Sequence, residues 1–163
     1  MTIARRPIAR RFARLCVRGC LAVAFLGVWP AAADAACTIS ATGVNFGTYD
    51  VFSSTPDDST GTITYRCGSN DHHITVTLSR GSSGTFSPRR MNQAGGEQLA
   101  YNVFTDATRT TIWGDGSGGT SVYSETNPPN NQDVVLTLYG RIPALQDVSV
   151  GSYADTLVAT VNF

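Results

Sequence analysis

Residues 74–79 read Ile-Thr-Val-Thr-Leu-Ser, and this stretch indicates the fold class of the chain. Apolar and hydroxyl-bearing residues alternate one by one, so Ile74, Val76 and Leu78 fall on one face of an extended strand. The same period of two recurs in residues 62–67, 99–103, 134–139 and 156–163. Because no window shows an apolar stripe with a helical period, the sequence predicts an all-β fold.

Turn signals separate these short strands. Glycine, serine, asparagine and proline cluster in residues 81–84, 95–96, 114–119 and 127–131. Short strands at this spacing are typical of a β-sandwich of immunoglobulin-like size. The sequence contains no internal repeat and no linker, so we predict one domain over residues 36–163.

The first 35 residues have the pattern of a secretory signal peptide. Six arginines lie within residues 1–18, fifteen uncharged and mostly apolar residues follow at 19–33, and residues 33–35 read Ala-Asp-Ala. A basic start, a short apolar run and a small-residue site predict cleavage between Ala35 and Ala36. A membrane-spanning helix needs roughly 20 apolar residues, so we expect no stable membrane anchor.

The charge distribution argues against a nucleic-acid-binding protein. The chain has no lysine, and its twelve Lys+Arg are all arginines against twelve acidic residues. After residue 35 six arginines face eleven acidic residues, a formal charge of −5. Affinity for nucleic acids depends mainly on cationic contacts to phosphates, which a lysine-free acidic domain supplies poorly.

Two of the four cysteines remain after the predicted cleavage. Cys16 and Cys20 leave with the signal peptide, whereas Cys37 and Cys67 stay. An even number of cysteines in an exported protein predicts a disulfide. Closing a loop of about 30 residues contributes roughly 3–4 kcal/mol on chain-entropy arguments.

We find no set of residues with the chemistry of an active site or metal site. His72 and His73 are the only histidines, and neighbours in a strand point to opposite faces, so they do not converge on one metal. The glycine-rich stretch 114–119 is similar to the nucleophile region of trypsin-like proteases, but Gly116 breaks the spacing. We therefore predict no catalytic residue, no metal and no cofactor.

The alternating pattern at 156–163 continues to the last residue, Phe163. An apolar strand edge without cover is an aggregation hazard. We expect either that this strand is internal to its sheet or that a partner covers its neighbour.

Four elements, taken together, resemble the spore coat protein U domain. They are the opening at 36–50, the second cysteine strand at 61–67, the central element Leu-Ala-Tyr-Asn-Val-Phe-Thr-Asp at 99–106, and the ending Gly-Ser-Tyr-Ala-Asp-Thr-Leu-Val-Ala-Thr-Val-Asn-Phe at 151–163. They occur in the order found in the family and extend over the whole predicted mature chain.

This resemblance implies an incomplete immunoglobulin-like β-sandwich that is pilin-like and lacks its last strand. Similar proteins are secreted subunits of archaic, Csu-type chaperone–usher pili, which serve adhesion and biofilm formation. In the family a periplasmic chaperone covers the gap, an outer-membrane usher exports the subunit, and a neighbouring subunit's N-terminal segment replaces the chaperone. The disulfide would join the first two strands.

The resemblance also assigns binding roles at the end of the chain. Four residues on one face would line the acceptor groove for the chaperone or donor strand: Leu157, Ala159, Val161 and Phe163. Basic residues of the chaperone would hold the terminal carboxylate. The expected localisation is the cell surface, in a fibre, reached through the periplasm.

One feature departs from the family pattern. Polymerising subunits carry a donor segment before the first cysteine strand, and after cleavage only Ala36 would precede Cys37. We therefore expect a subunit that accepts a strand without donating one, as a tip or capping subunit would.

Other functions remain open at this point. The chain could be a stand-alone spore-coat or outer-surface structural protein with a self-completed sandwich. It could also be a carbohydrate-binding adhesin, with Trp113 and Tyr123 stacking on sugars, although the apolar pair with Ile112 favours a core position for Trp113. An enzyme is the weakest alternative.

Overall fold

The computed structural model describes residues 37–68 and 71–163. The predicted signal peptide and the cleavage site between Ala35 and Ala36 lie outside the described residues. The strands are β1 (Thr38–Thr42), β2 (Asp57–Arg66), β3 (His73–Leu78), β4 (Arg89–Asn92), β5 (Gln98–Phe104), β6 (Tyr123–Thr126), β7 (Val134–Ile142) and β8 (Ala159–Asn162). Within the described ranges no helix has the length and apolar character needed to cross a membrane.

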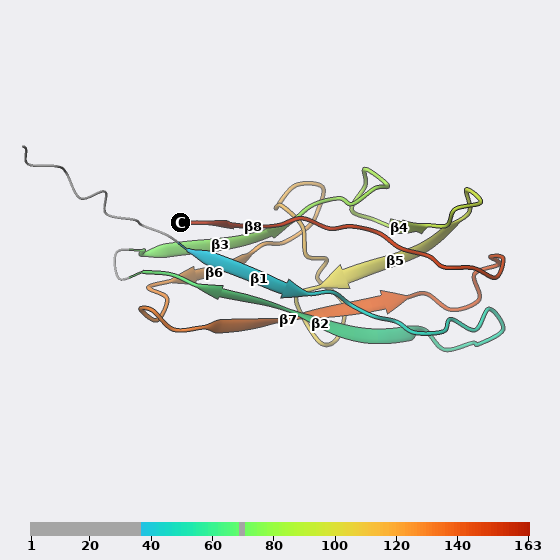
Figure 1. Ribbon diagram of the computed structural model, residues 1–163, viewed down its shortest axis with the longest axis horizontal. Helices are drawn as coiled ribbons and strands as arrows, with labels where there is room; N and C mark the ends of the chain where they lie inside the picture. The colour runs from blue at the N-terminus through green and yellow to red at the C-terminus, as the bar shows by residue number, and fades with distance from the viewer. Residues whose placement is uncertain (1–36, 69–70) are drawn as a thin grey trace, which may run out of the picture. The chain divides into compact units, whose positions relative to one another are not determined.

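The strands form two antiparallel sheets. The first has the order β1-β2-β7-β5-β4, and the second has the order β6-β3-β8 (Figure 1). Crossovers between sheets are expected in a sandwich of immunoglobulin-like size. The all-β prediction is therefore confirmed, and each alternating segment identified in the sequence contributes a strand.

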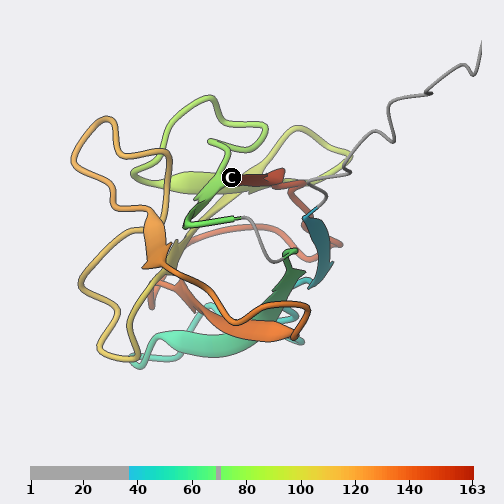
Figure 2. The ribbon, with the colours of Figure 1, turned by 90° about the vertical axis from the view of Figure 1, so that its left-hand side faces the viewer.

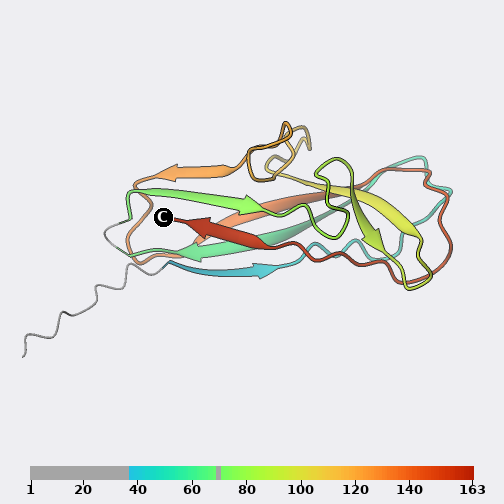
Figure 3. The same ribbon diagram turned by 90° about the horizontal axis from the view of Figure 1, so that it is seen from above.

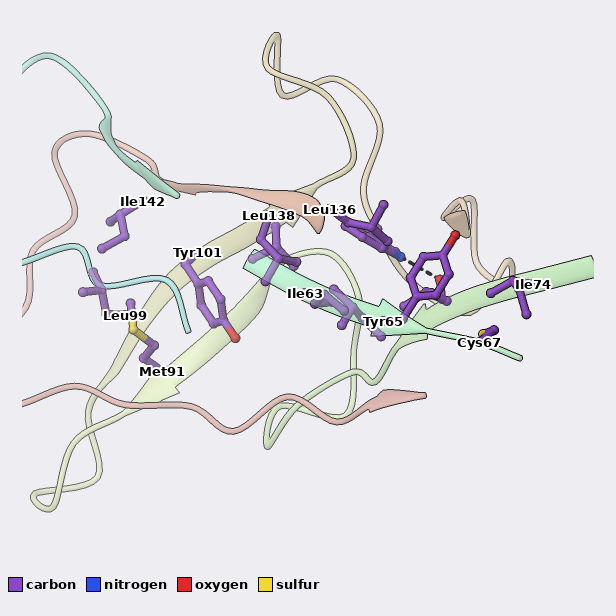
Figure 4. Close-up of a cluster of buried hydrophobic side chains, with 14 residues drawn as sticks. Ile63, Tyr65, Cys67, Ile74, Met91, Leu99, Tyr101, Leu136, Leu138 and Ile142 are labelled. Carbon is purple, nitrogen blue, oxygen red and sulfur yellow. Dashed lines mark hydrogen bonds between the residues drawn. The ribbon is translucent and has the colours of Figure 1, made fainter. Parts of the chain in front are cut away.

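The core lies between the two sheets. Figure 4 shows inward-pointing side chains from β2, β3, β5 and β7 meeting in one cluster. Trp113 is 2% exposed there, and its indole N–H donates to the Val76 carbonyl at 2.9 Å. The buried set comprises Ile63, Tyr65, Cys67, Ile74, Val76, Leu78, Met91, Leu99, Tyr101, Val103, Trp113, Leu136, Leu138 and Ile142.

A buried arginine ties the two sheets together at β4. Arg89 is 0% exposed and donates to the Ser79 carbonyl at 2.9 and 3.1 Å, to Asn102 Oδ1 at 2.8 Å and to the Trp113 carbonyl at 2.7 Å. Burial lowers the pKa of this guanidinium. Its planar fork suits several acceptors at once, so oxygen atoms of the backbone and of Asn102 take the place of water around the charge.

The predicted disulfide is present between Cys37 and Cys67. Cys37 immediately precedes β1 and Cys67 immediately follows β2, and Thr38 is paired with Arg66 at the ends of these strands. The bridge therefore closes the end of the β1–β2 pair, in agreement with the role that the family resemblance implied.

The last strand is shorter than its sequence pattern suggested. We expected a strand over 156–163, but β8 covers Ala159–Asn162. The reason lies in Ser79, whose carbonyl is occupied by Arg89. The Val158 N–H therefore donates to the Ser79 hydroxyl at 2.9 Å instead of a strand carbonyl, which interrupts the ladder. Leu157 consequently lies before β8.

Candidate functional site

The outer edges of β1 and β8 are unpaired within the described part of the chain. β1 pairs with β2, and β8 pairs with β3. Figure 2 shows both strands at the same side of the sandwich, one from each sheet, and Figure 3 shows them running in opposite directions. We call this surface the open side, and it consists of β1, β8 and the segments 43–52 and 148–158 that continue them.

On the β1 wall, side chains that face the core remain exposed. Ile39 is paired with Tyr65, and residues directly opposite each other in an antiparallel pair share one face of the sheet. Tyr65 is 1% exposed, whereas Ile39 is 37% exposed. Ala41, opposite Ile63, is exposed in the same way. β1 has a neighbouring strand, β2, on one edge only. The core-facing side chains of β1 are therefore left exposed at its other edge.

The β8 wall repeats this pattern. Val161 is opposite Val76, and Ala159 is opposite Leu78. Val76 and Leu78 are buried, but Val161 and Ala159 are only half-buried although they pack against the same core. The two walls therefore present incompletely covered rows of core-facing residues toward each other.

The structure places the four residues expected to line an acceptor groove along this wall. Leu157, Ala159 and Val161 are half-buried and contact the core from the open side. Phe163 follows β8 and is exposed. The first three are brought together on one face by strand alternation, whereas Phe163 extends past the strand.

A cavity of about 680 Å³ lies at one end of the open side. Its walls are residues 44–52 and 148–153, and its floor includes the core residues Met91, Leu99 and Ile142. Figure 4 shows these three floor side chains close together at one end of the core cluster. At the rim Phe52 and Val150 are 88% and 99% exposed. The cavity thus opens the hydrophobic interior to the surface.

Sequence reasoning missed the β1 wall and this cavity. Ile39 and Ala41 occur in a short segment with hydroxyl neighbours, and Val44 and Phe46 alternate in the segment that follows. That alternation was the available signal, since both side chains are half-buried and contact the core. The partner wall from a distant part of the chain could not be read from local sequence.

Hydrogen bonds hold both walls of the cavity. On one wall Glu97 accepts from the Ser149 N–H and hydroxyl, each at 2.6 Å, and from the Tyr153 hydroxyl at 3.0 Å. These bonds, chiefly those from Ser149, lower the pKa of the Glu97 carboxyl. On the other wall the Tyr49 hydroxyl donates to the Pro143 carbonyl at 2.8 Å. The cavity therefore has walls that are fixed before anything enters it.

Asp155 anchors the segment that leads into β8. Its carboxylate accepts from the Tyr101 hydroxyl at 2.7 Å and from the Ser82 N–H at 2.9 Å. Burial alone would raise the pKa of Asp155, but the hydrogen bonds from Ser82, Tyr101 and Thr156 lower it overall. Gly81 has a φ of +69°, and a Cβ there would collide with this carboxylate. Two of the recognised sequence elements, 99–106 and 151–163, therefore meet at one hydrogen bond.

The other candidate sites considered from the sequence do not assemble. Sγ of Cys37 and of Cys67 lie near the Asp71 carboxylate, but the two sulfurs are bonded to each other and offer no thiolate to a metal. His72 and His73 are exposed, and His72 contacts Asn127.

Trp113 cannot stack on a sugar because it is buried in the core, as its apolar context suggested. Tyr123 is half-buried with its ring 6.1 Å from that of Tyr65. The two residues proposed for carbohydrate stacking therefore do not form an exposed aromatic platform.

The two-sheet architecture with its open side defines an incomplete immunoglobulin-like sandwich of the pilin type. A sequence model of the spore coat protein U domain matches residues 22–160, and the chain belongs to this family. The resemblance noted from four sequence elements is thereby confirmed.

Two known proteins show the similarity in detail. Protein U of Myxococcus xanthus is 34% identical over 132 residues, which is 74% of this chain and 71% of Protein U. A crystal structure of the CsuC–CsuE chaperone–tip adhesion subunit pre-assembly complex, from archaic chaperone-usher Csu pili of Acinetobacter baumannii, matches with a TM-score of 0.55 and 28% identity. That match covers 78% of this chain but only 40% of the solved chain.

Proposed function

We propose that this protein is a secreted structural subunit of a surface fibre of the chaperone–usher type, and that its open side accepts a β-strand from another polypeptide. The observation that carries this proposal is the pair of core-facing rows left half-covered on β1 and β8. Ile39 is exposed although its partner Tyr65 is buried, and Val161 is only half-buried although its partner Val76 is buried.

An added strand would both pair with the open strand edges of this surface and cover its exposed apolar side chains. Its backbone would pair with the free N–H and C=O groups of the strand edges, and its alternate side chains would cover the exposed rows. Because β1 and β8 run in opposite directions, such a strand is parallel to one and antiparallel to the other. Each apolar side chain buried in this way contributes roughly 1.5–3 kcal/mol when fully covered.

The partners follow from the proposal. A periplasmic chaperone would supply the strand first, an outer-membrane usher would receive the complex, and a neighbouring subunit would then replace the chaperone. The likeness to the CsuC–CsuE chaperone–tip adhesion subunit pre-assembly complex supports the chaperone step and a position at the fibre tip. Leu157, Ala159, Val161 and Phe163 would contact the incoming strand. Removal of residues 1–35 and export through the periplasm would place the subunit on the cell surface, in adhesion and biofilm formation.

The test supplies the missing strand in cis. The exported chain is extended at its C-terminus by a flexible linker and a strand of alternating valine and serine, and a matched version carries prolines in the strand. Proline removes the backbone donors and blocks pairing. We expect the valine–serine extension to raise the thermal midpoint by roughly 10 °C or more over the proline version. Equal midpoints would show that the sandwich is self-completed, as a stand-alone coat or outer-surface protein requires.

A further inference from the structure

The cavity on the open side has an apolar floor but an acidic rim. Among its described lining residues none is Lys, Arg or His, and Asp50 is one of them. Glu97 holds two further lining residues, Ser149 and Tyr153. Two carboxylates, those of Asp50 and Glu97, therefore lie in or beside the wall of a cavity that has no basic residue among its described lining residues.

None of the arginines among the described residues lines the cavity. Those that form ion pairs contact other acids, at Arg66–Asp133, Arg109–Asp58 and Arg141–Asp58. Arg89 is buried, and Arg80 lies over the Phe86 ring at 5.1 Å. Arg90 neighbours the floor residue Met91 in β4, so its side chain points to the opposite face. Within the described residues no ion pair neutralises Asp50 or Glu97.

The rim charge is held in position by local bonds. Asp50 Oδ1 accepts the Phe52 N–H at 3.0 Å, and Phe52 itself lines the cavity. The Glu97 carboxylate is fixed by three hydrogen bonds. A negative side chain brought to this rim is repelled by the fixed carboxylates, whereas a positive side chain is attracted by them.

We propose that the strand accepted on the open side places a bulky apolar side chain in this cavity and a lysine or arginine beside it, at the acidic rim. This inference rests on the proposed function and adds the chemistry of the partner to it. The floor of Met91, Leu99 and Ile142 favours the apolar group, and the carboxylates of Asp50 and Glu97 favour the adjacent cation. A strand with aspartate or glutamate at that position is disfavoured.

The experiment uses the full exported chain and blocked synthetic peptides of about eleven residues, long enough at ~3.3 Å per residue to follow the open side. The peptides alternate valine and serine and end in phenylalanine flanked by Lys, Gln or Glu. Each is made with this group at either terminus, since the strand direction is set by the protein. Binding is measured by fluorescence anisotropy in low and high salt.

We expect the Lys peptide to bind about tenfold more tightly than the Glu peptide at low salt, with Gln between them. High salt reduces this ratio because rim charges are screened. Asp50→Asn keeps the hydrogen bond to Phe52 and should cut the ratio to about threefold. The matched variant Asp133→Asn removes an exposed carboxylate beside Arg66, away from the cavity, and should leave the ratio unchanged.

The outcomes separate the two proposals. Equal binding of all three peptides, unaffected by Asp50→Asn, overturns the charge preference but keeps strand acceptance. Binding of none of the peptides overturns strand acceptance and the charge preference with it. A preference for Lys that Asp133→Asn abolishes as strongly as Asp50→Asn also overturns the inference, because the effect would then come from net charge.

Discussion

β3 and β8 are neighbours in one sheet and have similar sequences, yet one is buried and the other is not. Val76 and Val161 are opposite each other in the pairing, as are Leu78 and Ala159. The β3 residues are buried, and their β8 partners are half-exposed. β3 has β6 on its other flank, whereas the other flank of β8 has no strand among the described residues.

The comparison teaches that alternation specifies which face of a strand is apolar but not how completely that face is covered. Around Trp113 and Arg89 the interior is closed by side chains from several segments and by hydrogen bonds to buried oxygens. Along β8 the same kind of residue contacts the core from one side only. The difference lies in the neighbours, and each prediction below compares the closed and the open region.

The largest effect is expected from Trp113→Ala in the closed region. The change removes a fully buried indole and leaves the Val76 carbonyl without its donor. We expect a loss of about 3–5 kcal/mol in the free energy of unfolding, measured by urea denaturation. The matched change in the open region, Phe52→Ala, removes a ring that is almost fully exposed and should cost less than about 0.5 kcal/mol. Comparable losses for the two variants would contradict the comparison.

The next largest effect is expected from replacing both Cys37 and Cys67 by alanine. Losing a loop closure of this size should cost about 2–4 kcal/mol. All five residues of β1 are exposed, so the strand has few packing contacts to replace the bridge. Hydrogen exchange should show faster exchange of the β1 amides than of the β3 amides. Uniform loss of protection in both strands would argue against a specific role at the open side.

A smaller contrast is expected between Val76→Ala and Val161→Ala, which remove the same atoms from paired positions. We expect about 2 kcal/mol for the buried Val76 and about 1 kcal/mol for Val161, from the transfer of two methyl groups and their different burial. Both values come from urea denaturation. In the strand-extended protein described above, the cost of Val161→Ala should rise toward that of Val76→Ala. An unchanged difference would mean that the added strand does not cover Val161.

The smallest effect is the dependence of stability on acid pH. The folded-state pKa of Asp155 is lowered overall, so the unfolded chain binds protons more readily. The stabilisation is present above the unfolded pKa of about 4 and is lost as pH falls through the lower folded value. Urea midpoints should therefore decrease below about pH 4, and Asp155→Asn should flatten this decrease. An equally steep decrease in the variant would assign the effect to other carboxyls.

Much of the fold could be predicted because its determinants are local. The period of two in segments such as 74–79 identified the strands, and the even count of cysteines left after the predicted cleavage identified the disulfide. The buried position of Trp113 followed from its apolar neighbour Ile112. Each of these signals is carried by residues close in sequence or by composition.

The candidate site could be predicted only in part. The face shared by Leu157, Ala159 and Val161 was visible from alternation. The segment with Ile39 and Phe46 also alternates, but its position as the opposite wall could not be read from local sequence. The β8 ladder ends early because the Arg89 guanidinium donates hydrogen bonds to the Ser79 carbonyl. This is a tertiary contact between a buried side chain and the residue that follows β3. Such contacts leave no periodic signal.

By itself, the sequence determined which segments form strands with one apolar face each and which two cysteines were expected to pair, and its resemblance to the family implied that this bridge joins the first two strands. Only the tertiary structure decided that β1 and β8 lie on the same side of the sandwich, each with one edge unpaired among the described residues, and that a cavity with an acidic rim lies between the segments that continue them. The physical reason is that alternation is set by backbone geometry within a strand, whereas coverage depends on which distant segments pack beside it.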